Sequence, residues 1–351
     1  MRDVAILSFA QSASVRREAR RNEVEILMPV VREAVARSGI PRAEIDFICS
    51  GSTDYLQGSP FAFVMGLDAV GAWPPVAESH VEMDGAFALY EAWVKIQTGQ
   101  AESALVYGFG KSSPGDVAEI LALQLDPYTV APLWPDAVSL AALQARLCLE
   151  AGVVTEKEMA EVAARSRRDA LSNPNAQLRG EFSADALLSE PYLVDPLRRH
   201  DCPPISDGAA AMVIASAEAA ARSAVRPVFI RGFDHRAEPQ DLGVRDLTRS
   251  VSTELAGEKA GVGRAPVELA ELYAPFTHQE ILLRRALGLG DGVRINPSGG
   301  PLAANPLMAA GLIRVGEAAA RVASGEARRA VAHATSGPCL QQNLVCVLEG
   351  E

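Results

Sequence analysis

The chain has 351 residues, of which 48% are hydrophobic and only 5% aromatic, and its formal net charge is −11. This length suits two compact α/β halves. The acidity argues against a nucleic-acid partner, because a phosphate backbone is repelled by an acidic surface. No run approaches roughly 18 consecutive apolar residues, so we expect no membrane span.

The cysteines predict a reducing compartment. There are five of them, an odd number, and no two have the C-x-x-C spacing of a redox or zinc motif. We therefore expect the free thiols of a cytoplasmic protein rather than a disulfide framework. The N-terminus already has the pattern of a strand and shows no apolar signal segment.

Apolar periodicity predicts the elements of a first half, residues 1–220. We expect strands at 4–9, 45–49, 75–81 and 104–108, and helices at 23–38 and 84–98. The segment 114–204 differs, because it is helical, polar and rich in proline. We interpret it as an excursion from the sheet that forms either a lid or a subunit contact. A buried strand at 212–215 closes this half.

The second half, residues 221–351, repeats this order. Strands are expected at 228–232, 269–273, 294–296, 330–334 and 344–348, with helices at 250–260 and 279–287. Pro306 is expected in the first turn of a further helix that runs to about Ala323, because a missing N–H does no harm there. A duplicated βα arrangement would leave a site where the loops of two similar sheets converge, beyond their strand ends.

The segment Arg294–Gly311 contains mostly glycine, alanine and proline. Gly299 and Gly300 permit backbone conformations that other residues rarely adopt. Backbone can therefore approach a ligand closely here, or the segment is only a tight connection between a strand and a helix.

Several motifs along the chain together resemble the thiolase superfamily. They are Glu82-Met83-Asp84-Gly85, Ser206-Asp207-Gly208-Ala209-Ala210, Glu271-Leu272-Tyr273-Ala274-Pro275-Phe276, Asn296-Pro297-Ser298-Gly299-Gly300, Asn305–Gly311 and His333–Asn343. The resemblance is closest to the sterol-carrier-protein-type thiolases and bacterial lipid-transfer proteins, the acetyl-CoA acetyltransferase-like branch of steroid catabolism. It implies a thiolase fold: two duplicated βαβαβαββ halves in a five-layer α/β/α/β/α sandwich, with a helical excursion.

The residues of thiolase chemistry are replaced in this chain. By the resemblance, the nucleophilic cysteine falls on Glu82, one histidine on Tyr273 and the other on Asn305. The second cysteine falls at Ser336-Gly337, with Cys339 nearby. A carboxylate cannot carry an acyl group as a thiolate does, because it would form a labile anhydride. We therefore expect no thiolytic or Claisen activity.

The resemblance leaves three functions open. Some relatives are aldolases that cleave β-hydroxyacyl-CoA side chains of steroids with tyrosines as proton carriers and a small OB-fold acyl-CoA-binding partner. Tyr273 matches one such tyrosine, whereas the place of the other reads Ala334-Thr335-Ser336-Gly337. The chain is then a retro-aldol enzyme in a hetero-oligomer, a catalytically silent supporting subunit, or an acyltransferase. The implied partners are a second copy or a second thiolase-like chain, and a coenzyme A thioester is the implied substrate, with no tightly bound cofactor.

Each candidate catalytic residue has a structural alternative. Tyr273 either transfers a proton or is a buried tyrosine with a satisfied hydroxyl. Glu82 is a base, or a carboxylate that the N–H groups of a helix start satisfy. Asn305 donates to a thioester oxygen or caps the following helix. His278 either reaches the cleft or lies on the surface, and His333 is a second histidine candidate.

The substrate-binding candidates surround these positions. The resemblance suggests backbone N–H groups at Gly300 and Gly337, together with Ser336 and Cys339, although small-residue packing also accounts for the cysteine. No metal is expected at His80, Glu82 and Asp84, since a helix start interrupts their shared strand face. Arginine suits phosphate, so the excursion offers arginines for the nucleotide of coenzyme A, or only an exposed helix face: Arg165, Arg167, Arg168, Arg198 and Arg199.

Overall fold

A computed structural model describes residues 2–58, 60–73 and 75–350. The strands of the first half are β1 (Val4–Gln11), β2 (Phe47–Gly51), β3 (Ala77–Val81), β4 (Ser103–Gly110) and β7 (Gly208–Ser216). Those of the second half are β8 (Val228–Ala237), β9 (Leu269–Leu272), β10 (Arg294–Ile295), β11 (Arg329–Ser336) and β12 (Gln342–Gly350). Every expected strand is present, with ends shifted by a few residues.

The two halves of the sheet have the same topology. Their spatial orders are β3-β2-β4-β7-β1 and β10-β9-β11-β12-β8. In the first, β2 is parallel to β3 and β4, while β7 is antiparallel to β4 and β1. The second repeats these directions strand for strand. A short antiparallel pairing of β1 with β8 joins them into one ten-stranded sheet. The predicted duplication is confirmed.

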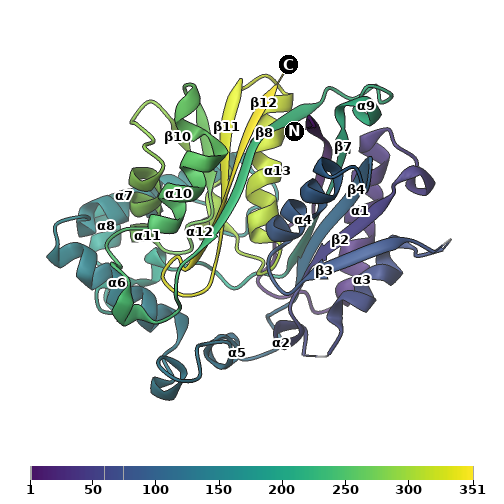
Figure 1. The fold of residues 1–351 in the computed structure, drawn as a ribbon. Helices are drawn as coiled ribbons and strands as arrows, with labels where there is room; N and C mark the ends of the chain where they lie inside the picture. Colours follow the sequence, from purple (N-terminus) through teal and green to yellow (C-terminus); the bar gives the residue numbers. More distant parts are fainter. Residues whose placement is uncertain (1, 59, 74, 351) are drawn as a thin grey trace.

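Helices complete five layers (Figure 1). The outer face of the first half is covered by α1 (Glu23–Ser38) and α3 (Ala62–Val70), and that of the second by α10 (Val251–Ala260) and α11 (Thr277–Ala286). Between the halves lie α4 (Gly85–Gln97) and α13 (Ala310–Ala323), which share one apolar core with strands of both. The predicted five-layer thiolase fold is confirmed; α3 was not predicted.

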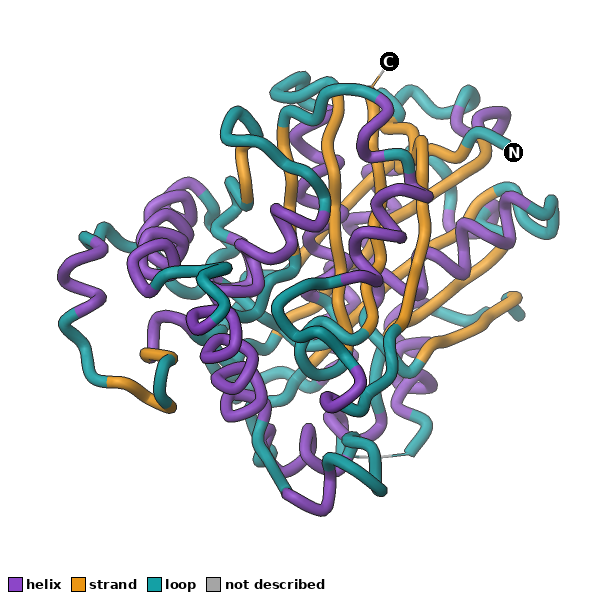
Figure 2. The backbone as a smooth tube through the Cα atoms, turned by 60° about the vertical axis from the view of Figure 1, so that its left-hand side comes forward, coloured by secondary structure: helices purple, strands orange, loops and turns teal. Residues whose placement is uncertain are grey.

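The excursion lies to one side of the sheet, as Figure 2 shows. It consists of α5 (Val117–Leu123), α6 (Ala137–Glu150), α7 (Glu156–Asp169), α8 (Ala184–Leu188) and the hairpin β5 (Tyr192–Val194)–β6 (Leu197–Arg198). The remaining α-helices are short: α2 (Asp54–Gln57), α9 (Ala217–Ala220) and α12 (Gly300–Ala303). No described helix has both the length and the apolarity to cross a membrane. All five cysteines are buried and free.

Local signals fix the helix starts where the prediction was accurate. At α1, Asn22 and Glu25 form a reciprocal capping box. At α4, the side chain of Asp84 accepts a hydrogen bond from Ala86 N at 2.8 Å.

The expected helix start at Pro306 is wrong. Pro306 forms an isolated bridge with Ser206, and α13 begins only at Ala310. Met308 has a φ of 71°, which is incompatible with a continuous helix. The first-turn N–H groups of Gly311 and Leu312 are instead capped from another element, by the carboxylate of Asp84 at 2.9 Å each. A partner distant in sequence therefore decides where this helix begins.

Candidate active site

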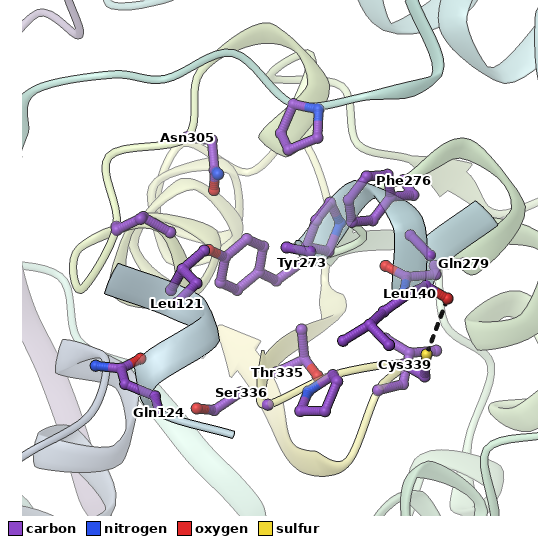
Figure 3. Close-up of a pocket in the computed structure, with 18 of the residues that line it drawn as sticks. Leu121, Gln124, Leu140, Tyr273, Phe276, Gln279, Asn305, Thr335, Ser336 and Cys339 are labelled. Carbon is purple, nitrogen blue, oxygen red and sulfur yellow. Dashed lines mark hydrogen bonds between the residues drawn. The ribbon is translucent and has the colours of Figure 1, made fainter. Parts of the chain in front are cut away.

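A cavity of about 230 Å³ lies beyond the ends of β9 and β11, where the loops of the two halves meet (Figure 3). Its walls also include the start of α4 and residues of α5 and α6 in the excursion. Most of the lining is apolar, from residues such as Leu121, Leu125, Leu140, Ala141, Pro203, Phe276, Leu307 and Leu340. The cavity therefore suits a predominantly apolar ligand that meets a few polar groups.

Tyr273 is the first residue after β9 and lines this cavity. Its backbone N–H donates to His333 O at 3.1 Å, which ties the strand end to β11. The side chain is 5% exposed, and its hydroxyl makes no hydrogen bond to any described residue. Burial and the negative charge of Asp84 raise the pKa of Tyr273 above its usual range. The hydroxyl therefore keeps its proton and is available as a donor.

Asn305 enters the cavity from the loop before α13, and its carboxamide points towards the ring of Tyr273 (Figure 3). Its backbone N–H donates to Ser206 Oγ at 3.0 Å, which fixes the loop. The side-chain oxygen Oδ1 is buried and has no partner among the described residues. Asn305 does not cap a helix, so the alternative of a purely capping role is wrong.

Asp84, rather than Glu82, brings the carboxylate of the α4 loop to the cavity. Its oxygens accept the N–H groups of Ala86, Gly311 and Leu312, at the starts of two helices. Burial raises the pKa of Asp84, against these hydrogen bonds and the charge of Arg314, which lower it. Asp84-Gly85 before an apolar helix indicates a capping carboxylate, whereas the resemblance pointed to Glu82, two residues earlier.

Glu82 and Gly300 lie outside the cavity lining. Glu82 accepts a hydrogen bond at 3.2 Å from the backbone N–H of Asp54, the first residue of α2. Gly300 has a φ of 63°, and its N–H donates to Ser298 Oγ at 3.2 Å. A Cβ at position 300 would lie 2.9 Å from the Asn296 side chain, so glycine serves tight packing here.

Ser336, Gly337 and Cys339 form the wall opposite Asn305, where β11 turns into β12 (Figure 3). The turn is strained, since the non-glycine residues Cys339 and Leu340 have φ values of 53° and 58°. The thiol of Cys339 donates to Leu140 O at 3.4 Å, and burial raises its pKa to about 12. The sulfur is therefore a neutral thiol, not the thiolate that an acyl carrier requires.

Neither candidate histidine lines the cavity, and both are fully buried, so the surface alternative for His278 is wrong. His333 Nε2 lies 3.0 Å from Asn343 Oδ1, and His278 Nε2 lies 3.1 Å from Gln144 Oε1. Burial lowers the pKa of His278 to about 3 and that of His333 to about 4. Both side chains are therefore neutral at physiological pH.

Behind Tyr273, a buried ion pair holds the strand end in place. Glu271 Oε2 lies 2.6 Å from Arg314 Nη1 and accepts from Ser298 Oγ at 2.7 Å, and Glu271 Oε1 accepts from Ser298 N at 3.0 Å. Alongside it, Asn296 Oδ1 accepts from Leu272 N at 2.6 Å. The Asn-Pro-Ser-Gly-Gly motif thus positions β9 through its polar residues as well as through its glycines.

The excursion arginines are mostly engaged within the protein. Arg165 pairs with Glu280, Arg167 donates to Leu302 O, and Arg198 pairs with Glu156 at 2.7 Å. These contacts tie the excursion together and to the second half. In the described part of the chain, no group of three His, Cys, Asp or Glu side chains is arranged for a metal ion.

No family model matches the chain, but named relatives do. The benzoylsuccinyl-CoA thiolase subunit BbsB of Thauera aromatica is 28% identical over 229 residues, 56% of this chain and 59% of that subunit. An acetyl-CoA acetyltransferase of Methanothermobacter thermautotrophicus is 25% identical over 96% of this chain and 95% of its own. Sterol carrier protein 2 of Gallus gallus is 25% identical over 86% and 63%, respectively. The chain thus spans less than two thirds of the first and third relatives.

Two solved structures share the fold. The Ltp2-ChsH2(DUF35) aldolase superposes with a TM-score of 0.83 at 19% identity, over 99% of this chain and 98% of that one. The human mitochondrial 3-ketoacyl-CoA thiolase superposes with a TM-score of 0.79 at 16% identity, over 100% and 99%. With the duplicated sheet, they show that the chain has the thiolase fold, and the relatives above show that its sequence is similar to thiolases, acetyl-CoA acetyltransferases and sterol carrier protein 2.

Proposed function

We propose that this chain cleaves a carbon–carbon bond of a β-hydroxyacyl-coenzyme A thioester by retro-aldol chemistry. The observation that carries this proposal is the polar content of the cavity. It holds a protonated tyrosine hydroxyl and an unpaired carboxamide, whereas its one thiol is buried and neutral. Such a set can transfer protons and bind an oxyanion, but it cannot carry an acyl group.

The reaction needs a base, an oxyanion site and a proton donor. The β-hydroxyl loses its proton, the Cα–Cβ bond breaks, and its electron pair moves into the enolate of the thioester. The enolate then takes a proton at Cα, which yields a shorter acyl-CoA and an aldehyde or ketone. We assign proton donation to Tyr273, oxyanion binding to Asn305 with the N–H of Gly337, and acceptance of the β-hydroxyl proton to Asp84, whose raised pKa favours it.

The relatives support the class of substrate and the need for a partner. Acetyl-CoA and benzoylsuccinyl-CoA appear in the names of two relatives, and one of these is a subunit. The neighbour with the TM-score of 0.83 is an aldolase of two named components. We therefore propose a cytoplasmic hetero-oligomer that acts on a lipid or steroid acyl-CoA, with a second thiolase-like chain or a small OB-fold protein.

Turnover by the complex tests the proposal. The full chain, purified with its native partners, is supplied with β-hydroxyacyl-CoA, and the shorter acyl-CoA and the carbonyl product are quantified by mass spectrometry. We expect Tyr273→Phe to lower turnover by roughly 10²–10⁴-fold, the usual contribution of a general acid. The control is Tyr128→Phe, since Tyr128 is 87% exposed and lies outside the cavity lining. Equal turnover by the two variants would remove the catalytic role of Tyr273.

A catalytically silent supporting subunit is the second candidate. One observation favours it: the cavity has Thr335 and Ser336 beside a single tyrosine, and neither histidine reaches it. In that case Tyr273→Phe and Asp84→Asn would both leave turnover of the complex unchanged, while omission of the chain would abolish it. Under the retro-aldol proposal each substitution alone lowers turnover.

The acyltransferase alternative requires an acylated cysteine. Cys339 is the one cysteine in the cavity lining, and its thiol is bonded to Leu140 O. After incubation with acetyl-CoA, we expect the intact mass of the chain to be unchanged. A gain of one acetyl group at Cys339 would instead favour the acetyltransferase alternative.

A further inference from the structure

Gln279 lies in the first turn of α11 and lines the cavity next to Leu140, Phe276 and Leu340. It is 3% exposed, so its carboxamide has left bulk water. The sequence pattern indicates only that this residue begins a helix. A buried amide beside an apolar cavity needs a hydrogen-bond partner for its oxygen as well as for its nitrogen.

The orientation of this amide follows from two backbone carbonyl groups. The side-chain nitrogen of Gln144 lies 3.1 Å from Leu247 O and 3.5 Å from Cys339 O. A carbonyl oxygen can only accept, so this end of Gln144 must be its NH₂ group. Its oxygen therefore faces the other way, and there it accepts hydrogen bonds from His278 Nε2 at 3.1 Å and from Gln279 Nε2 at 3.0 Å.

This chain of hydrogen bonds fixes the amide of Gln279. Its nitrogen must face Gln144, so its oxygen, Oε1, must face away and can only accept. Oε1 is buried and has no partner among the residues that the structure describes. Figure 3 shows the carboxamide at the cavity wall, across from Asn305 and Ser336. An unpaired buried acceptor is energetically costly, so a ligand that donates to it would gain affinity.

We infer that Gln279 Oε1 is a subsite for a hydroxyl group on the acyl moiety of the ligand. This inference rests on the proposed function in one respect, namely that an acyl thioester fills the cavity. The walls around Gln279 are aliphatic and aromatic, so a charged ammonium donor would lose its hydration there without a counter-charge. A neutral hydroxyl on an apolar chain fits both the acceptor and its surroundings. Either the β-hydroxyl or one further along the chain supplies this chemistry.

Binding of matched thioesters tests the inference. The ligands are octanoyl-, β-hydroxyoctanoyl- and ω-hydroxyoctanoyl-coenzyme A, and affinities are measured by titration calorimetry on the purified complex. All measurements use a Tyr273→Phe background, so that no ligand is cleaved. We expect one hydroxylated ligand to bind roughly tenfold more tightly than octanoyl-coenzyme A, the gain from one satisfied buried acceptor. Which of the two does so identifies the position that Gln279 recognises.

Substitution of Gln279 attributes the preference to this residue. Gln279→Met keeps the length of the side chain but removes the acceptor, and His278 still satisfies Gln144 Oε1, so the fold is retained. We expect the hydroxylated and plain ligands to bind this variant equally. The matched control is Gln124→Met, also at the cavity wall, where Gln124 Nε2 donates to Thr53 Oγ1 at 3.3 Å. It should keep the hydroxyl preference.

Three results would overturn the inference: no preference in the unsubstituted position, a preference that survives Gln279→Met, or no binding of any of the thioesters. The first needs no substitution of Gln279, so a folding defect of Gln279→Met leaves the inference testable. The retro-aldol proposal is decided separately by turnover. A hydroxyl preference without cleavage would refute that proposal and leave this subsite in place.

Discussion

Two groups of buried polar side chains near the end of β9 differ in whether they have partners within the protein. Outside the cavity lining, Glu271 is 0% exposed, and its carboxylate is matched by Arg314 and Ser298. In the cavity lining, the side-chain oxygens of Asn305 and Gln279 are buried and have no partner among the described residues. The paired cluster around Glu271 therefore lies next to a cavity lining that contains unpaired acceptors.

This contrast shows which groups serve the fold and which remain for a ligand. We call the buried group of Glu271, Arg314 and Ser298 the rear cluster. A buried charge is tolerated only when it is paired, so substitutions in this cluster are expected to be strongly destabilising. An unpaired buried acceptor lowers stability, and one in a cavity lining can be satisfied by a ligand. The four predictions below test this division, from the largest expected effect to the smallest.

Removal of the rear cation should have the largest effect. Arg314→Met removes the cation 2.6 Å from the buried Glu271 carboxylate and leaves only Arg321, 3.8 Å from the other oxygen, so we expect a loss of about 3–5 kcal/mol in the free energy of unfolding. Urea unfolding monitored by circular dichroism measures it. The control is Arg249→Met, which breaks the more exposed pair with Glu254 and should cost much less stability than Arg314→Met. Similar losses in both variants would contradict the special role of the rear cluster.

Acidification should lower the free energy of unfolding through His278 and His333. Each has a hydrogen-bond partner at Nε2 but none at Nδ1 among the described residues. Burial holds the pKa of His278 at about 3 and that of His333 at about 4, below the ordinary value of 6.5. The neutral forms are thus favoured in the folded state. Their stabilisation is complete above about pH 6.5 and is lost as the pH falls towards these values, by roughly 2–3 kcal/mol per histidine at pH 4.

Urea midpoints between pH 7 and pH 4 provide the measurement. His333→Gln retains a side-chain donor for Asn343 but has no titrating ring, so its stability should fall less steeply with acid than that of the parent chain. An unchanged slope would mean that His333 does not titrate with folding.

Gly110 tests how closely the first half supports the cavity wall. A Cβ at this position would lie 1.9 Å from the backbone oxygen of Leu307, a cavity residue. Gly110→Ala must push that loop away, and we expect a loss of about 1–3 kcal/mol, together with weaker thioester binding. Gly290→Ala is the control, since nothing lies within 4 Å of the added Cβ. Full stability of Gly110→Ala would show that the loop moves freely.

Tyr273→Phe should have the smallest effect on stability. Its hydroxyl has no hydrogen bond to lose among the described residues, so the free energy of unfolding should change by less than about 0.5 kcal/mol. The same substitution is expected to abolish most turnover. A large loss of stability would reveal a structural role for the hydroxyl. It would also weaken the contrast between the paired cluster around Glu271 and the polar groups of the cavity lining.

Much of the fold was predictable because its signals are local. The apolar periodicity and the Asn22–Glu25 capping box agree with the observed bounds of α1, and the repeated order of strands and helices indicated the duplication. Tyr273, Asn305, Ser336, Gly337 and Cys339 were placed in the site from their motifs, and all five line the cavity.

Three residues that the sequence offered as candidates, Glu82, His278 and His333, lie outside the cavity lining for a common reason. Glu82 and Asp84 are two positions apart, and only the packing of α4 against α13 decides that Asp84 faces the cavity. His278 and His333 stand beside cavity residues in sequence, yet their rings turn into the core. Adjacent positions on a strand or helix point in different directions, so a motif alone does not determine which side chain reaches a site.

The sequence by itself determined the composition class, the order of strands and helices, the duplicated halves and the motifs that border the site, because propensity, capping and periodicity act over a few residues. Only the tertiary structure decided which polar groups are paired. Asp84 meets Gly311 across 227 positions, Glu271 meets Arg314 across 43, and Gln144 meets Gln279 across 135. These pairings depend on how the layers pack. They leave Asn305 Oδ1 and Gln279 Oε1, both from residues of the cavity lining, without a partner among the described residues.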